Sequence, residues 1–87
     1  MFVYDFSFRS LTGAQNGRSV LQDSGIASLL TRAPKRISEQ GCGYVLEVSS
    51  FDGELAAHVL RRSSVGFRRI FRQYDTGEME ELTYDLL

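Results

Sequence analysis

The first residues of the chain alternate between aromatic and mostly polar side chains. A period of two residues is typical of a β-strand that buries one face. We therefore expect a strand at residues 2–9 whose aromatic side chains point to the inside of the protein. The inner positions are Phe2, Tyr4, Phe6 and Phe8, and the outer positions are Val3, Asp5, Ser7 and Arg9.

The following segment, residues 10–22, allows two interpretations. Asn16-Gly17 is a strong signal for the turn of a β-hairpin. Residues 18–22 are therefore expected either to return as a second strand or to belong to a loop, and the sequence leaves both alternatives open.

A helical period follows Asp23 or Ser24, since either residue can cap the N-terminus of a helix. Apolar residues recur at the spacings of one helix face. Pro34 interrupts this stripe but the period continues past it, which favours one helix that is kinked at Pro34 and ends at Gly41. The stripe consists of Ile26, Leu29, Leu30, Ala33 and Ile37.

The second half of the chain predicts two hairpins. Asp52-Gly53 is a typical turn for the first of them, and its more apolar face is expected to lie on the helix. That face consists of Tyr44, Leu46, Val48, Leu55, Ala57 and Val59, while the mixed face consists of Val45, Glu47, Ser49, Ala56, His58 and Leu60.

The second hairpin has its expected turn at residues 75–78, with Tyr74 opposite Met79. This register places phenylalanine opposite leucine on one face and arginine opposite an acidic residue on the other. Because a shift by one residue changes every pair, the match favours this register. The expected pairs are Phe71–Leu82, Phe67–Leu86, Arg72–Glu81 and Arg68–Asp85.

These elements predict one α+β domain, residues 1–87. One helix would pack on a mainly antiparallel sheet of four or five strands, in the order strand, helix, four-strand meander. That order resembles the cystatin/monellin topology. The resemblance concerns topology alone, because the hairpin sequence of residues 49–53, Ser-Ser-Phe-Asp-Gly, lacks the glutamine-valine-glycine motif of the cystatin inhibitors, and a topology does not define a function.

The composition narrows the class of protein. The chain has one cysteine, Cys42, and one histidine, His58. An intrachain disulfide is therefore excluded, and these two residues are too few for the usual zinc site. The first residues do not have the pattern of a signal peptide, and no apolar run is long enough to span a bilayer. We expect a cytoplasmic protein without a cofactor and without contact to a membrane.

The charged residues are unevenly distributed although the net charge is −1. Residues 61–72 contain five arginines and no acidic residue, whereas residues 75–87 contain five acidic residues and no base. The predicted register neutralises part of the arginine cluster. Three arginines are left without an expected partner and are candidate contacts to nucleic acid: Arg61, Arg62 and Arg69.

Two combinations of polar residues have the chemistry of a catalytic site. Cys42 and His58 would make a nucleophile–base pair, but Cys42 is expected near the level of Ser63, about 16 Å from His58 along the predicted strand. Glu47 is expected opposite His58, as an ordinary surface pair. The sequence therefore predicts no catalytic site, and a small enzyme that uses these residues is the least favoured alternative.

The outer face of the sheet is expected to expose more aliphatic side chains than a solvated face needs. An exposed apolar patch is typical of an interface. We therefore expect a small non-enzymatic binding or regulatory protein, acting as a homodimer or with a protein partner, of the kind encoded by phages and other mobile elements. The alternative is a nucleic-acid-binding protein that uses the arginine-rich strand 61–72. The candidate interface residues are Val3, Val45, Leu60 and Ile70.

Overall fold

The computed structural model describes residues 1–38, 41 and 43–83. The described residues form five strands and three helices, which confirms the predicted α+β class. In chain order they are β1 (Phe2–Phe8), α1 (Leu11–Asp23), β2 (Leu29–Arg32), α2 (Lys35–Ser38), β3 (Tyr44–Ser49), α3 (Gly53–Arg62), β4 (Arg69–Tyr74) and β5 (Met79–Leu82).

The strands form one sheet in the order β2-β3-β1-β4-β5, and each neighbouring pair is antiparallel. The elements β1-α1-β2-β3-α3-β4 have the split β-α-β arrangement of ferredoxin-like folds. The short helix α2 is inserted between β2 and β3, and β5 extends the sheet beyond β4. The predicted meander is wrong, because β1 lies in the centre of the sheet, between β3 and β4.

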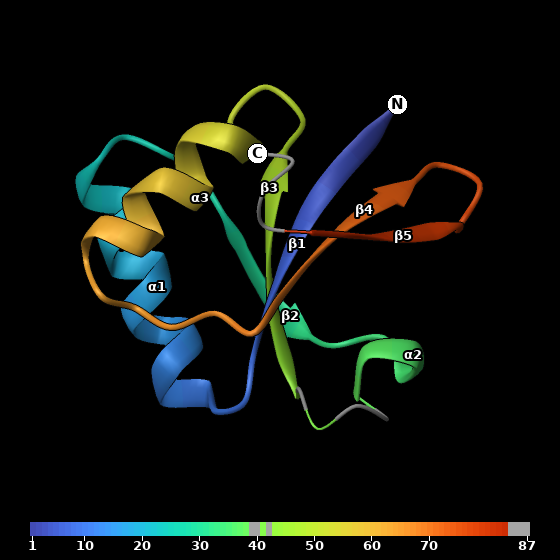
Figure 1. The fold of residues 1–87 in the computed structure, drawn as a ribbon, viewed down its shortest axis with the longest axis horizontal. Helices are drawn as coiled ribbons and strands as arrows, with labels where there is room; N and C mark the ends of the chain where they lie inside the picture. Colours follow the sequence, from blue (N-terminus) through green and yellow to red (C-terminus); the bar gives the residue numbers. More distant parts are fainter. Residues whose placement is uncertain (39–40, 42, 84–87) are drawn as a thin grey trace.

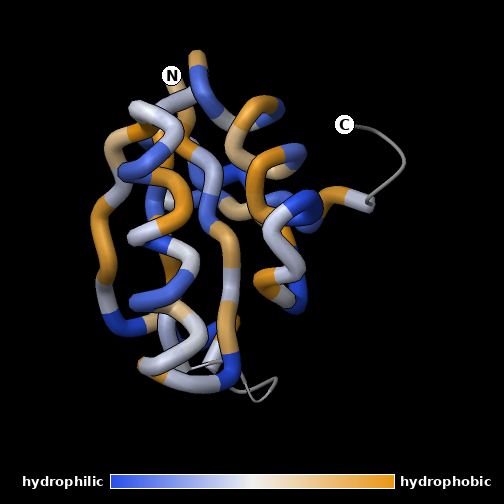
Figure 2. The backbone as a smooth tube through the Cα atoms, turned by 90° about the vertical axis from the view of Figure 1, so that its left-hand side faces the viewer, coloured by the Kyte–Doolittle hydropathy of each residue, from blue (hydrophilic) through white to orange (hydrophobic). Residues whose placement is uncertain are grey.

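The two faces of the sheet are covered unequally. Helices α1 and α3 lie together on one face, and the single turn of α2 lies on the other (Figure 1). The larger core forms under α1 and α3 and contains Phe6, Leu46 and Ile70. A smaller core of Ile37, Val45 and Phe71 lies on the α2 side. Figure 2 views the two long helices, along which hydrophilic and hydrophobic stretches alternate, as expected for amphipathic helices.

Helix α1 replaces the hairpin or loop predicted for residues 10–22. The Ser10 hydroxyl caps it by accepting a hydrogen bond from the Gly13 N–H, 3.0 Å away. Its buried residues, Ala14, Gly17 and Leu21, have helical spacing. Gly17 therefore belongs to a helix face and not to a turn: a Cβ there would lie 2.9 Å from the Phe8 ring, so glycine lets α1 approach the sheet.

Helix α3 replaces the second strand of the predicted first hairpin. Asp52-Gly53 begins the helix instead of forming a hairpin turn. The buried positions recur at intervals of three, one and three residues, which is a helical pattern. The face that we expected to be apolar in a strand, Leu55, Ala57 and Val59, shares only Ala57 with this stripe. The buried residues are Gly53, Ala56, Ala57 and Leu60.

The kinked helix predicted for residues 24–41 is wrong as well. Residues 29–32 form the edge strand β2, paired with β3. The Pro34 carbonyl accepts hydrogen bonds from the N–H groups of Ile37 and Ser38, so Pro34 starts the turn of α2, where a missing N–H costs nothing. Ile37 is buried as predicted, but against the opposite face of the sheet from Leu30.

The predicted β4–β5 hairpin is present, but its register differs by one residue. The structure pairs Ile70 with Leu82 and Arg72 with Glu80. The Tyr74 N–H donates to the Glu78 carbonyl, and Gly77 has φ +89°. A three-residue loop that ends in a left-handed glycine is a common hairpin connection; it replaces the four-residue turn that we expected. Phe67–Leu86 and Arg68–Asp85 each include a residue outside the described part of the chain.

Membrane crossing by a helix is not supported by the part of the chain that the structure describes, because its helices are too short or too polar for that purpose.

Candidate functional site

The expected interface residues do not form one exposed patch. Val45, Leu60 and Ile70 are buried inside the monomer, and Val3 is partly buried. Leu60 and Ile70 belong to the core under α1 and α3, whereas Val45 packs with Ile37 of α2. The expectation failed because α3 was interpreted as a strand and because α2 covers part of the outer face.

The arginines of residues 61–72 do not lie on one strand. Arg61 and Arg62 form the last turn of α3, where they are exposed. Arg69 begins β4 and makes a salt bridge of 3.2 Å to Glu81, and Arg72 makes one of 3.4 Å to Glu80. The cluster is therefore divided between a helix end and a strand that is already paired with acidic residues.

The Glu47–His58 pair does not exist, because the two residues lie on different faces of the sheet. His58 is exposed on α3, and Glu47 is opposite Asp5 of β1. Cys42 lies outside the described residues. The predicted distance between Cys42 and His58 assumed a hairpin that is absent, so it no longer argues against a functional thiol.

The connection between β2 and β3 carries Cys42 in its sequence. It begins at Ala33, whose N–H donates to the Gly43 carbonyl across a distance of 3.0 Å. Gly41 has φ +86°, and no atom of a described residue, its chain neighbours aside, lies within 4 Å of where a Cβ would stand at Gly41 or at Gly43. The two residues that flank Cys42 in the sequence are therefore glycines with unfilled space beside the backbone.

Asp5 lies on the face of the sheet that carries α2. Ile37 of α2 packs with Val45 of β3 and Phe71 of β4, and β1 runs between these two strands. Helix α2 therefore crosses β1 near Asp5, the direct partner of Phe71.

The Asp5 side chain is only 1% exposed, and neither of its carboxylate oxygens has a hydrogen-bond partner among the described residues. Burial, assisted by the charge of Glu47, raises the pKa of Asp5 to about 7. Sequence reasoning missed this group because an acid in an alternating strand is normally solvated.

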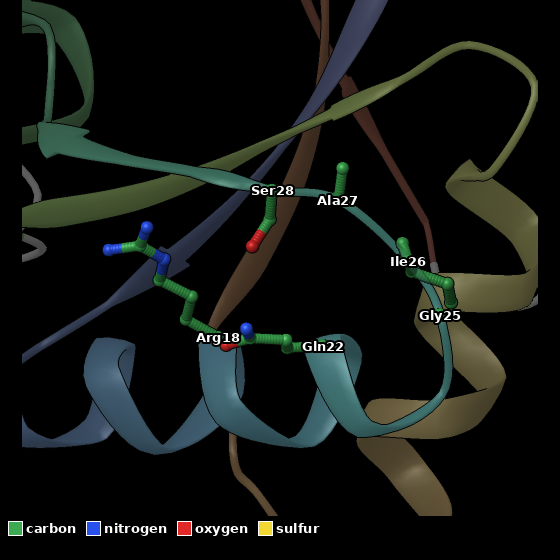
Figure 3. Close-up of a pocket in the computed structure, with 6 residues that line it drawn as sticks. All are labelled: Arg18, Gln22, Gly25, Ile26, Ala27 and Ser28. Carbon is green, nitrogen blue, oxygen red and sulfur yellow. The ribbon is translucent and has the colours of Figure 1, made fainter.

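A pocket of about 300 Å³ lies between α1 and the segment that leads into β2. In Figure 3 the side chains of Arg18 and Gln22 come from α1, and the Ser28 side chain points toward them from the opposite wall. The Ser28 hydroxyl is buried and has no hydrogen-bond partner among the described residues. The lining contains one positive charge and no acidic residue: Arg18, Gln22, Gly25, Ile26, Ala27 and Ser28.

Metal binding has no support from the described residues, in which no three side chains of histidine, cysteine, aspartate or glutamate come together.

Comparison with known proteins identifies a family. The model of a protein family described as "Putative Se/S carrier protein-like" matches residues 4–72. The match begins in β1, ends in β4 and contains Cys42, so it covers most of the chain. No curated protein and no solved structure matches.

Proposed function

The chain belongs to this family of Se/S carrier protein-like proteins, and from this premise we propose that it carries sulfur or selenium on the thiol of Cys42. The observation that supports the proposal is the match over residues 4–72, because the chain has no cysteine other than Cys42. A cysteine thiolate is the side chain that can hold such an atom covalently and release it again, as in a persulfide.

The proposed transfer needs no oxidant. The Cys42 thiolate attacks the outer sulfur of a donor persulfide, R–S–SH. A new S–S bond forms, the donor S–S bond breaks, and the donor leaves as the thiolate R–S⁻. Cys42 then holds –S–SH, or –S–SeH when the donor is R–S–SeH. An acceptor nucleophile removes the outer atom in the reverse sense.

A single cysteine suits a carrier. A second thiol in the same chain could attack the loaded sulfur of the first, form a disulfide and expel the cargo as sulfide. This chain has no second thiol, so the cargo leaves only to another molecule. Gly41 and Gly43, with open space at their Cβ positions, add no bulk that would obstruct the approach of a donor.

The test is loading of the purified chain with glutathione persulfide, followed by intact-mass spectrometry. We expect an added mass of one sulfur atom on the wild type, removed by dithiothreitol, and no added mass on Cys42→Ser. Glutathione treated with selenite tests selenium in the same way. Equal labelling of Cys42→Ser, or an unlabelled wild type under conditions that load free cysteine, would refute the proposal.

Three further expectations from the sequence continue as proposals. We infer that the chain is not itself an enzyme, since carriage is stoichiometric. It would work in the cytoplasm, where thiols stay reduced, and it would self-associate. No comparable observation supports nucleic-acid binding, because Arg69 and Arg72 already pair with Glu81 and Glu80.

A further inference from the structure

Strand β2 has one edge to which no described strand is paired. It stands at the end of the sheet, next to β3. The Ala33 N–H donates to the Gly43 carbonyl, in the same register that pairs Thr31 with Val45 and Leu29 with Glu47. In an antiparallel ladder, hydrogen-bonded pairs alternate with pairs that are not bonded to each other. Leu30 and Arg32 therefore turn their N–H and C=O groups away from β3, as a template for another strand.

A proline follows the C-terminal end of this edge, and a pocket lies at its N-terminal end. At its end, Pro34 has no N–H to offer, so the row of outward donors stops at Arg32. At its beginning lies the pocket of Arg18, Gln22 and Ser28, whose three side chains offer hydrogen-bond donors (Figure 3). A strand added here would run from this pocket to the connection that contains Cys42 in its sequence.

The charge of this edge selects the kind of partner. Arg18 and Arg32 are exposed, and neither makes a salt bridge within the described residues. Two copies of β2 would bring like charges together, which disfavours self-pairing. The acidic strand β5 is a poor partner because Glu80 and Glu81 already pair with Arg72 and Arg69.

We propose that β2 and this pocket form a docking site for an extended acidic segment of a partner protein. The segment adds a strand to β2 through the outward groups of Leu30 and Arg32, as in other cases of strand addition. One of its carboxylates enters the pocket and accepts hydrogen bonds from the Arg18 guanidinium and the Ser28 hydroxyl. Only the identification of that partner as a sulfur or selenium donor or acceptor rests on the proposed function.

The probe is a blocked peptide of alternating valine and glutamate, with a glutamine-for-glutamate peptide as its neutral match. Cys42→Ser is titrated with each peptide and observed by ¹H–¹⁵N NMR. We expect the acidic peptide to bind at least about fivefold more tightly than its neutral match, since charge-assisted hydrogen bonds are the stronger ones. The largest shifts should fall on the amides of Leu30, Arg32 and Ser28.

Variants separate the pocket from the edge. Arg18→Gln should weaken the acidic peptide about tenfold, the loss of one charge-assisted contact, whereas Arg9→Gln, an exposed arginine outside the pocket, should leave its affinity unchanged. Arg32→Pro removes one outward N–H and should weaken binding more than Arg32→Gln does. A far-ultraviolet spectrum shows whether Arg32→Pro is folded, and Arg18→Gln tests the proposal independently of it.

Several results would overturn the proposal: equal affinity for the two peptides, shifts that map to β5, or an Arg18→Gln variant that binds like the wild type. Binding of inorganic phosphate in the pocket with no peptide bound at the edge would assign the site to small anions instead. Because Cys42→Ser is the titrated protein, these results do not depend on whether Cys42 carries sulfur.

Discussion

At the scale of single residues, Asp5 has an unusual environment. Most buried carboxylates pair with a base or accept hydrogen bonds. Asp5 is buried and does neither among the described residues. The group therefore favours its neutral form, and its pKa is raised to about 7 from the usual 3.8. The stability of the fold should depend on this one proton.

The sign follows from the two pKa values. Between about pH 4 and pH 7 the folded protein holds a proton that the unfolded chain has lost. The free energy of unfolding therefore decreases as the pH rises through this range, by up to about 4 kcal/mol, and stays low above it. Asp5→Asn should lack this decrease and be more stable than the wild type above pH 7.

Urea unfolding at pH 5, 6, 7 and 8 measures the effect. The charged side chains on this side of the sheet are unchanged in the variant, so their titration is shared by both proteins; they include Glu47, Arg69 and Glu81 on the strands and Lys35 and Arg36 on α2. Asp23→Asn, at an exposed aspartate, is the control. If the free energy of unfolding changed with pH in the same way for the wild type and Asp5→Asn, the raised pKa of Asp5 would be contradicted.

At the scale of elements, the sequence predicted several of the strands but neither of the long helices α1 and α3. β1, β3 and the β4–β5 hairpin were predicted close to their observed positions. The errors began at Asn16-Gly17 and Asp52-Gly53, which are typical hairpin turns. Here glycine serves contacts between elements, with Phe8 and Leu46 at Gly17 and with Tyr4 at Gly53. Local preference cannot show such contacts, because their partners are distant in the sequence.

The same errors in the predicted elements affected the prediction of the candidate sites. Cys42 was singled out, but its functional role was set aside on the geometry of a hairpin that does not exist. The Arg18–Ser28 pocket could not be predicted, because α1 was interpreted as a hairpin or a loop. Its walls come from α1 and from the segment that leads into β2, and the sequence predicted neither element.

Gly53 offers a direct test of these contacts. A Cβ at this position would overlap the ring of Tyr4, which is buried beneath α3. Gly53→Ala should destabilise the protein by about 1–3 kcal/mol, despite the better helix propensity of alanine. Thermal or urea unfolding measures the loss.

The matched control is Gly66→Ala, because no atom lies within 4 Å of the Cβ position at Gly66. Its stability should stay within about 0.5 kcal/mol of the wild type. If the two variants proved equally stable, the close packing of α3 on Tyr4 would be disproved.

At the scale of the whole molecule, the exposed apolar surface differs from the surface that the sequence suggested. The outer face of the sheet is partly closed by α2, while Phe51 is 87% exposed and Leu55 is 54% exposed near the start of α3. Exposed apolar side chains that lie close together are typical of an interface, and we expect these two to form a contact between copies of the chain.

Self-association should therefore depend on Phe51 and Leu55. Light scattering coupled to size-exclusion chromatography should give twice the monomer mass for the wild type and the monomer mass for the Phe51→Ser, Leu55→Ser double variant. Leu11→Ser changes an exposed leucine elsewhere and should remain dimeric. A monomeric wild type at tens of micromolar would exclude the dimer.

The central position of β1 also affects how the protein reaches its fold. β1 precedes both of its neighbours in the chain by many residues: Val3 pairs with Ser49 and Phe2 with Tyr74. Contacts between such distant residues slow folding. During synthesis the aromatic strand lacks at least one of its neighbours until β4 has been made, and unpaired strand edges of this kind favour aggregation during folding.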